Sequence, residues 1–404
     1  MNSIFKNTRY KLIRNANLVA GFWLPRAENE KSPTIHLLEA LHLGNILLTM
    51  WSMIPFLEDV ARRISVRAVG PSVFTMLLYV TALTRYTHAI VARKKFCSLF
   101  AQVNSINNCK PFESDQKENL DSTCKKVRNM LFAQLSLFVL ANSAISYFGY
   151  KITTNREGSS AFNQMELELL GRAGQPELWT PRETLSIFLN MILSYMVPLK
   201  LITLDALLHL LYVFICDQVD FLEDQFDLIT KTESATEAQA TLQEWLSLFS
   251  KVKRLMIDVN DAFSFQTVSL LLSNMAIICF AAYTSAKVNL NMSDFFISMI
   301  NICLQIFSLF FFVTMIVLTL FSVLQTLLYC ISGQNLLNTA DKLCSRLANI
   351  SLADQPLVSV HHILLVETQR SFAVRGGPFF KLSLEFFATI IGAVFTYFMV
   401  LIQI

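Results

Sequence analysis

Long runs of apolar residues without charge limit what this chain can fold into. The clearest run begins at Phe386 and ends at Ile402, and it contains no acidic or basic residue. With its flanking turns it reaches the roughly 20 residues that a helix needs to cross a bilayer. The composition agrees, because 53% of the 404 residues are hydrophobic and only 16% are charged, whereas soluble domains average about 25% charged residues. The sequence therefore predicts an all-α, polytopic membrane protein.

Seven segments are predicted to cross the membrane as helices. Their apolar runs are long and unbroken, unlike the roughly ten-residue alternating segments of a membrane β-barrel. We divide the chain into a cytoplasmic segment at 1–35, the first five helices with cytoplasmic extensions at 36–286, the sixth helix with cytoplasmic anchor helices at 294–375, and the last helix at 379–404. The seven segments lie at 36–57, 69–91, 129–150, 185–212, 264–286, 294–330 and 379–404.

The distribution of Lys and Arg predicts the orientation of these helices. If the N-terminus is cytoplasmic, the inner segments hold 22 of these residues and the outer loops hold 8, which is the bias expected of cytoplasmic loops. The cysteines agree, because none of the eight lies in a predicted outer loop, where an oxidising environment would favour disulfides. We expect the N-terminus inside, the C-terminus outside and no cleavable signal peptide.

The predicted cytoplasmic segments are amphipathic helices rather than plain loops. Helical patterns occur at 237–259, 336–347 and 357–370. These helices would continue the membrane segments, and their apolar stripes would pack within one subunit or form a subunit interface. The run from Arg375 to Pro378 then interrupts helicity, as a plain break or as a hinge. The clearest stripe consists of Leu242, Trp245, Leu246, Phe249, Val252, Leu255 and Met256.

Polar side chains inside the spans mark the candidate binding region at 129–305, because a polar group left unsatisfied in a bilayer is costly. Amides, hydroxyls and phenols recur at similar depth in the outer halves of the middle helices. They would surround an outward-facing pocket for a small neutral ligand, or they would bond neighbouring helices to each other. The candidate ligand-binding residues are Asn142, Ser146, Tyr147, Asn190, Ser194, Asn274, Tyr283, Asn301 and Gln305.

Charged residues inside the predicted spans are few. Arg85 is expected to extend its side chain to the inner interface, and Lys200 and Asp205 are expected to form a local ion pair on their own helix. Asn291 begins a sequon in a predicted outer loop and is a candidate glycosylation site. The sequence has no catalytic motif and no Cys/His spacing typical of a metal site. We therefore expect no enzyme activity, no cofactor and no metal.

The end of the chain resembles the C-terminal signature of insect gustatory receptors. That signature reads Thr-Tyr, five hydrophobic residues, then Gln-Phe. Here Thr396 and Tyr397 are followed by five hydrophobic residues and Gln403, and Ile404 stands where the family has Phe. The signature lies on the last predicted membrane helix, and the predicted topology of the whole chain is similar to that of the family.

The resemblance implies a ligand-gated, non-selective cation channel in the plasma membrane of sensory neurons, opened by a small tastant such as a sugar or a bitter compound. It implies a homo- or heterotetramer with other gustatory receptor subunits, embedded in lipid, in which the last helices line one central pore. Gln403 and Ile404 would then form the extracellular constriction, with Ile404 as an apolar gate. Thr396 and Tyr397 would face neighbouring helices.

Three other classes of membrane protein are alternatives. Insect odorant receptors share the architecture and the mechanism, and the Thr-Tyr…Gln ending argues against them. A G-protein-coupled receptor would have its N-terminus outside, with D-R-Y-like and N-P-x-x-Y-like motifs that this sequence lacks. A transporter usually shows an internal repeat or helices interrupted at the midplane. The net charge of +3 is too small to indicate a nucleic-acid partner.

Overall fold

A computed structural model of the chain describes residues 66–107, 181–229, 235–292, 302–348 and 372–403, with single positions at 44, 46, 47, 50, 125, 129, 132, 133 and 136. These residues are almost entirely helical. The helices are α3 (Val66–Val91), α4 (Arg93–Asn107), α7 (Pro181–Ile229), α8 (Ala235–Met292), α9 (Ile302–Ala348) and α11 (Leu384–Gln403). The described strands are β1 (Arg375–Gly376) and β2 (Phe380–Lys381), which pair antiparallel.

Three of the helices are much longer than a bilayer requires. The helix α7 has 49 residues, α8 has 58 and α9 has 47. At a rise of about 1.5 Å per residue, α8 is about 87 Å long, whereas the hydrocarbon core of a bilayer is about 30 Å thick. The predicted inner helices at 237–259 and 336–347 are therefore direct continuations of membrane segments, as expected.

The structure also shifts several predicted boundaries. The helix α8 continues to Met292, so Asn291, which the sequence placed in an outer loop, lies on the last turn of a helix. The last helix begins at Leu384 rather than at Phe379, because the residues before it form the β1–β2 hairpin. The predicted helix at 357–370, and all but single positions of 36–57 and 129–150, lie outside the described residues.

Three stretches among the described helices are long and apolar enough to cross a membrane. They are Leu201–Asp227 in α7, Gln239–Cys279 in α8 and Thr319–Ala348 in α9. The helix α11 contains a shorter apolar stretch, Leu384–Val400, and it has the most hydrophobic sequence of the described helices. Length and composition therefore support the predicted membrane protein in this part of the chain.

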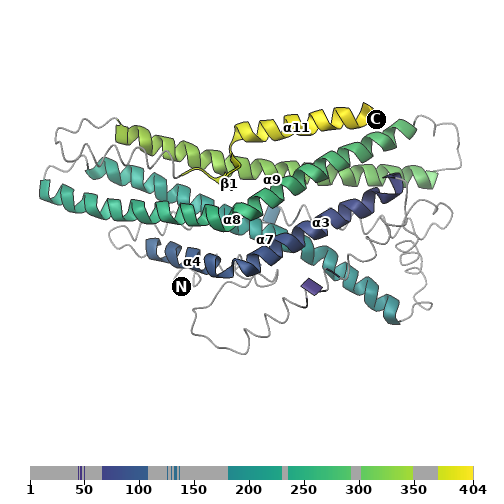
Figure 1. The fold of residues 1–404 in the computed structure, drawn as a ribbon, viewed down its shortest axis with the longest axis horizontal. Helices are drawn as coiled ribbons and strands as arrows, with labels where there is room; N and C mark the ends of the chain where they lie inside the picture. Colours follow the sequence, from purple (N-terminus) through teal and green to yellow (C-terminus); the bar gives the residue numbers. More distant parts are fainter. Residues whose placement is uncertain are drawn as a thin grey trace.

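The long helices form an extended bundle (Figure 1). Here α8 contacts α3, α4, α7, α9 and α11, and α7 also packs on α9. The starts of α3, α7 and α9 lie at one end of the molecule together with the C-terminal ends of α8 and α11. We name this the outer end and the opposite one the inner end, after the predicted orientation. The alternation of the helices between two ends agrees with the topology predicted from sequence.

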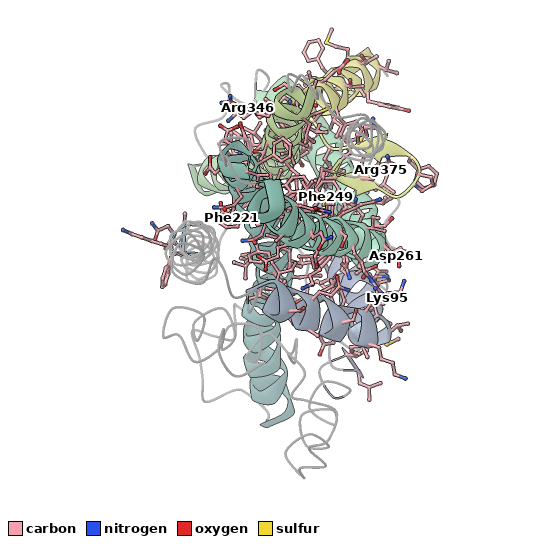
Figure 2. All side chains as sticks on the ribbon, turned by 90° about the vertical axis from the view of Figure 1, so that its left-hand side faces the viewer. Lys95, Phe221, Phe249, Asp261, Arg346 and Arg375 are labelled. Carbon is pink, nitrogen blue, oxygen red and sulfur yellow. The ribbon has the colours of Figure 1, made fainter. Side chains whose placement is uncertain are left out.

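The core of the inner half is the apolar stripe predicted on α8. Trp245 is 2% exposed, and its indole N–H donates a hydrogen bond to the carbonyl oxygen of Leu222 on α7 at 2.8 Å. Figure 2 shows Phe249 at the centre of the bundle, where its ring stacks on that of Trp245. Burying one large apolar side chain contributes about 1.5–3 kcal/mol. The stripe therefore packs within one subunit, and its members Val252, Leu255 and Met256 are fully buried.

A tight hairpin precedes α11, where the sequence predicted a break in helicity. Gly377 has a φ of 61°, a left-handed conformation that favours glycine. Arg375 pairs with Lys381, and Gly376 pairs with Phe380. Ser383 then caps the helix, because its Oγ accepts a hydrogen bond from the Phe386 amide at 3.1 Å. The predicted break is confirmed, and it consists of a hairpin rather than an open loop.

Candidate functional site: a buried charged network and the terminal helix

A buried ion pair joins α3 to α7. Arg85 Nη2 contacts Asp205 Oδ1, and the two side chains are 1% and 0% exposed. The prediction that Arg85 reaches the inner interface and that Asp205 pairs with Lys200 is therefore wrong. Asp205 follows Lys200 by five residues, a spacing that places them on different faces of a helix. A charge held between packed helices is stable only with an opposite charge beside it, and Arg85 supplies that charge from another helix.

The helix α9 adds two further donors to the same carboxylate. The hydroxyl of Tyr329 donates to Asp205 Oδ1 at 2.5 Å, and the amide of Gln325 donates to Oδ2. Both donors come from buried side chains. Asp205 thus accepts three hydrogen bonds from two neighbouring helices, which offsets the cost of removing its charge from water.

The helix α8 completes the arrangement through Gln266, which is 0% exposed. Its Oε1 accepts a hydrogen bond from Arg85 Nε at 3.1 Å, and its Nε2 donates to the backbone oxygen of Arg85 at 2.7 Å. One side chain therefore holds both the guanidinium and the backbone of α3. We call Arg85, Asp205, Gln266, Gln325 and Tyr329 the buried network. It joins α3, α7, α8 and α9 at one level of the bundle.

Two more polar side chains extend these contacts along the helices. Asn274 on α8 is 4% exposed and donates to Thr326 Oγ1 at 3.1 Å and to Gln325 Oε1 at 3.3 Å. His209 on α7 bonds Ser332 Oγ at 3.0 Å. The described contacts of Asn274 are hydrogen bonds between helices. This is one of the two roles that the sequence analysis considered for the polar residues inside the spans. Its role in ligand binding stays a prediction.

The other predicted ligand-binding residues are described only in part. Four positions and the gate residue lie outside the described residues: Asn142, Ser146, Tyr147, Asn301 and Ile404. The rest lie on described helices, without side-chain detail: Asn190 and Ser194 on α7, Tyr283 and the sequon residue Asn291 on α8, Gln305 on α9 and Gln403 at the end of α11. Asn190 and Ser194 belong to the first half of α7, Tyr283 to the C-terminal part of α8 and Gln305 to the start of α9. Their part in a ligand pocket stays a prediction.

The terminal helix α11 presents two different faces. Ile390 and Val394 are 4% and 7% exposed and pack in the core. On the remaining surface, Phe395 is 62% exposed and Tyr397 is 64% exposed. Thr396 is also exposed, and its hydroxyl donates to the Gly392 oxygen of its own helix at 2.9 Å. A narrow stripe therefore attaches α11 to α8 and α9, and a wide apolar surface is left open.

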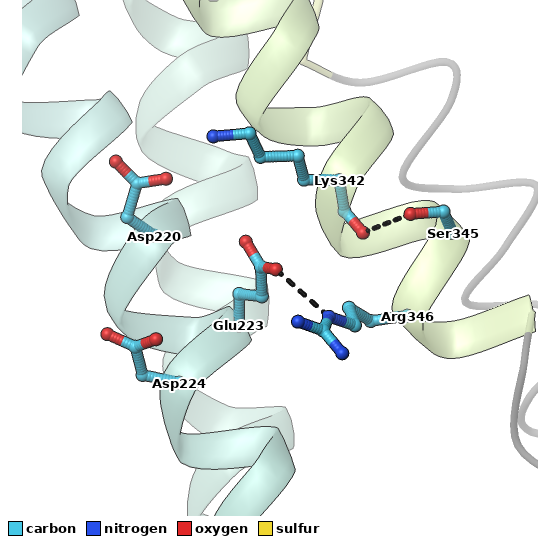
Figure 3. Close-up of a pocket in the computed structure, with 6 residues that line it drawn as sticks. All are labelled: Asp220, Glu223, Asp224, Lys342, Ser345 and Arg346. Carbon is cyan, nitrogen blue, oxygen red and sulfur yellow. Dashed lines mark hydrogen bonds and ion pairs between the residues drawn. The ribbon is translucent and has the colours of Figure 1, made fainter.

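A charged cleft of about 620 Å³ lies near the inner end between α7 and α9 (Figure 3). Across it, Arg346 Nε contacts Glu223 Oε1 at 3.3 Å. The Arg346 side chain is 55% exposed, so water screens this ion pair far more than the one in the buried network. The lining residues are Asp220, Glu223, Asp224, Lys342, Ser345 and Arg346.

The sequence profile of the 7tm chemosensory receptor family matches residues 68–404. The chain belongs to this family. The match includes every described helix from α3 onwards except for the first two residues of α3. It therefore covers the buried network, the hairpin and the terminal helix of this receptor.

Curated relatives of the receptor are odorant receptor coreceptors of insects. The coreceptor of Ooceraea biroi is 26% identical over 178 residues, which are 44% of this chain and 34% of the relative. The coreceptor of Harpegnathos saltator is 25% identical over 168 residues, which are 41% of this chain and 32% of the relative. The matched region thus spans about a third of the length of these relatives.

The fold is similar to that of a solved insect olfactory receptor. The structure of OR5 from Machilis hrabei in complex with eugenol matches this receptor with a TM-score of 0.74 at 15% identity, covering 100% of both chains. A second structure of the same protein matches with a TM-score of 0.68 at 17% identity. The receptor therefore has the all-α, seven-transmembrane-helix fold of the insect chemoreceptors. The odorant-receptor alternative fits these likenesses at least as well as the gustatory one.

The buried network is the part of the site that sequence reasoning missed. Its available signal was Arg85 itself, a permanently charged residue within an apolar segment, which by default has a partner inside the protein. The partner was hidden because Asp205 lies 120 positions away along the chain. The hydrogen bonds from Gln325 and Tyr329 depend on how α9 is rotated about its axis relative to α7. The spacing of residues in the sequence does not predict that rotation.

Proposed function

We propose that this receptor is a ligand-gated, non-selective cation channel of sensory-neuron plasma membranes, in which α11 helices from four subunits line a common pore. The observation that supports the proposal is the open surface of α11. An apolar face of this size marks an interaction site, and in a membrane it is covered by lipid or by further protein. The exposed side chains include Phe395, Tyr397, Met399 and Val400.

Two ligand classes follow from two observations. The Thr396-Tyr397…Gln403 ending favours a gustatory receptor opened by a sugar or a bitter compound. The coreceptor relatives and the olfactory receptor structures favour an odorant-type receptor that opens to small volatile molecules, alone or with a second subunit. Both classes of ligand are small neutral molecules, which bind in pockets of apolar and aromatic side chains with a few polar groups, and the residues predicted within 129–305 suit either.

The test is whole-cell current from cells that express this chain alone or together with an insect coreceptor, with G-protein signalling blocked. The panel contains sugars, bitter compounds and volatile aromatics. A fast non-selective cation current supports the channel, and the active class of compound assigns the ligand. A response that disappears when G-protein signalling is blocked contradicts it, as does surface labelling of an N-terminal tag on intact cells.

The pore is tested separately by Gln403→Ala, with Gln243→Ala as the matched control because Gln243 is an exposed amide on α8. If Gln403 lines the constriction, the substitution changes relative ion permeability or pore block. The reason is that the Gln403 side chains of the subunits would form a polar, uncharged ring around the pore, and alanine makes that ring apolar. Surface expression and agonist sensitivity stay at the control level. Unchanged permeation and block in Gln403→Ala would make the pore assignment wrong.

A further inference from the structure

The segment between the inner helices and α11 is held in place by specific polar contacts. Asn260 on α8 uses both ends of its side-chain amide for this. Its Nδ2 donates to the Ala373 oxygen at 2.9 Å, and its Oδ1 accepts from the Arg375 amide at 3.1 Å. A side-chain amide that binds a neighbouring N–H and C=O together fixes that backbone in both position and direction. Figure 2 shows Arg375 on the hairpin at the side of the bundle.

A second contact comes from α9. Gly333 lies so close to Leu382 that an added Cβ would be 2.8 Å from the Leu382 Cβ and closer still to its carbonyl oxygen. Leu382 is fully buried, and its amide donates to the Val374 oxygen at 2.9 Å. The glycine therefore permits a backbone approach that every larger residue would prevent. The next residue, Gln334, accepts from the Leu384 amide at 3.4 Å, at the first residue of α11.

The hairpin itself packs against the first turn of α11. The rings of Phe380 and Phe386 stack with centroids 4.4 Å apart and planes 11° from parallel. On the other side, Gly377 faces Ser264 on α8, whose Oγ would lie 3.0 Å from an added Cβ. The chain before the hairpin is anchored as well, because Phe372 is 1% exposed and packs edge-on against Phe249. The start of α11 therefore has fixed contacts with both α8 and α9.

The same two helices carry three of the five members of the buried network, Gln266 on α8 and Gln325 and Tyr329 on α9. Gly333 follows Tyr329 by four residues, one turn along α9, and Tyr329 donates to Asp205. On α8, Gln266 follows Asn260 by six residues of the same helix. A displacement of α8 or α9 at the level of the network therefore reaches the start of α11 through continuous helix. By contrast, the outer part of α11 presents a mostly open surface.

We propose that Asn260, Gly333 and Gln334 form a coupling clamp, a set of positioning residues that transmits movement of α8 and α9 to the terminal helix and so sets the agonist sensitivity of the channel. The inference rests on the proposed function, because it requires α11 to line the pore. It assigns these three residues a role in opening and none in ion permeation. They hold the backbone at 373–384 and contact neither the ligand nor the permeating ion.

The experiment compares Asn260→Ala with the control Gln243→Ala, which removes an exposed amide from the same helix. Both variants are expressed at matched surface levels. For Asn260→Ala, the agonist concentration for half-maximal current rises about tenfold and the maximal current falls, because two hydrogen bonds of the clamp are lost. The reversal potential and the single-channel conductance stay at wild-type values. Gln243→Ala behaves as wild type.

Two further variants distinguish an effect on channel opening from a folding defect of Asn260→Ala. Asn260→Asp keeps the size of the side chain and the bond to the Arg375 amide, but it places a carboxylate against the Ala373 oxygen. Gly333→Ala pushes on Leu382 from the other helix. Each is expected to raise the half-maximal concentration by about threefold or more. If all three variants fail to reach the surface while Gln243→Ala does, the segment is a folding element and the clamp is overturned.

A second readout does not depend on current. Amide hydrogen exchange of the purified receptor is expected to speed up at residues 373–384 in Asn260→Ala, at Arg375 first, and to stay unchanged in Gln243→Ala. If Asn260→Ala has wild-type agonist sensitivity, the clamp is overturned and the proposed function is not. A change in ion permeability without a change in agonist sensitivity has the same consequence. If the wild-type receptor gives no current, the proposed function is overturned. The role of the clamp in channel opening is then overturned as well, even if hydrogen exchange confirms the contact between Asn260 and the segment.

Discussion

Two arginine–carboxylate contacts in this receptor have the same chemistry and opposite surroundings. Arg85 and Asp205 are almost completely buried, whereas Arg346 and Glu223, at 55% and 17% exposure, lie at the charged cleft. The buried carboxylate accepts two more hydrogen bonds from α9. At the exposed pair, water and ions compete for the same groups. Burial, more than the presence of two opposite charges, therefore decides which contact fixes the arrangement of the helices.

The largest expected effect comes from breaking the buried pair. Asp205→Asn leaves the Arg85 charge without its counter-charge, and the loss of one partner in a buried pair costs about 3–5 kcal/mol. We expect little receptor at the cell surface, measured by labelling of intact cells. The double variant Arg85→Met with Asp205→Leu removes both charges and is expected to recover part of the surface expression. Wild-type expression of Asp205→Asn would show that the pair does not stabilise the bundle.

A smaller loss is expected from Tyr329→Phe, which removes one donor to a buried carboxylate without changing the packing. Hydrogen bonds to charged groups are worth about 1.5–3 kcal/mol. The temperature at which the detergent-purified receptor loses its monodisperse state should therefore fall. Tyr397→Phe, at a phenol that is 64% exposed, serves as the control for stability only. Equal temperatures for the two variants would contradict the importance of the Asp205 contact.

Asn274→Ala separates the two roles that remain open for this side chain. A polar bond between membrane helices averages about 0.6 kcal/mol, so the effect on thermal stability should be small. If Asn274 lines the ligand pocket, the change in sensitivity differs from one agonist to another. If it serves only to hold α8 to Thr326 and Gln325 on α9, all agonists shift by the same factor. In neither case does ion permeability change.

The smallest effects are expected at the exposed pairs. Arg346→Ala breaks the contact with Glu223, and Lys95→Ala breaks an ion pair with Asp261 in which both side chains are more than half exposed (Figure 2). Such pairs contribute about 0–1 kcal/mol and are screened by salt. Surface expression and thermal stability should stay within experimental error of the wild type. If Arg346→Ala lost as much surface expression as Asp205→Asn, the cleft would have to be buried in the assembled receptor.

Periodicity explains how much of this fold the sequence could predict. The stripe from Trp245 to Met256 repeats at helical spacing, so its helix and its buried face were both predicted correctly. The hairpin was predicted only as a break at Arg375–Pro378, because glycine and proline indicate where a helix ends but do not specify the structure of the next residues. The seven-helix membrane architecture followed from apolar length alone.

The contacts between helices could not be predicted in the same way. Arg85 and Asp205 are far apart in sequence, and pairing them requires the rotation and crossing of α3 and α7. Asn260 lies in an ordinary amphipathic helix, where its sequence position gives no sign that it binds the backbone of Ala373 and Arg375. The ending Thr396-Tyr397…Gln403 resembles a gustatory receptor signature, whereas the curated relatives are odorant receptor coreceptors. A short terminal motif shared within a superfamily does not fix the ligand class.

The length of α8 has a consequence for how the receptor can be controlled. Asn260 and Asn274 are separated by 14 residues, close to four full turns of one unbroken helix. The two side chains therefore lie on nearly the same side of a single rod. Turning that rod about its own axis moves both amides in the same direction at the same time. Under the proposed function, in which α11 lines the pore, a rotation of α8 that starts at its inner end is expected to displace the hairpin before α11 and the contacts with α9 together, so the two would not move independently.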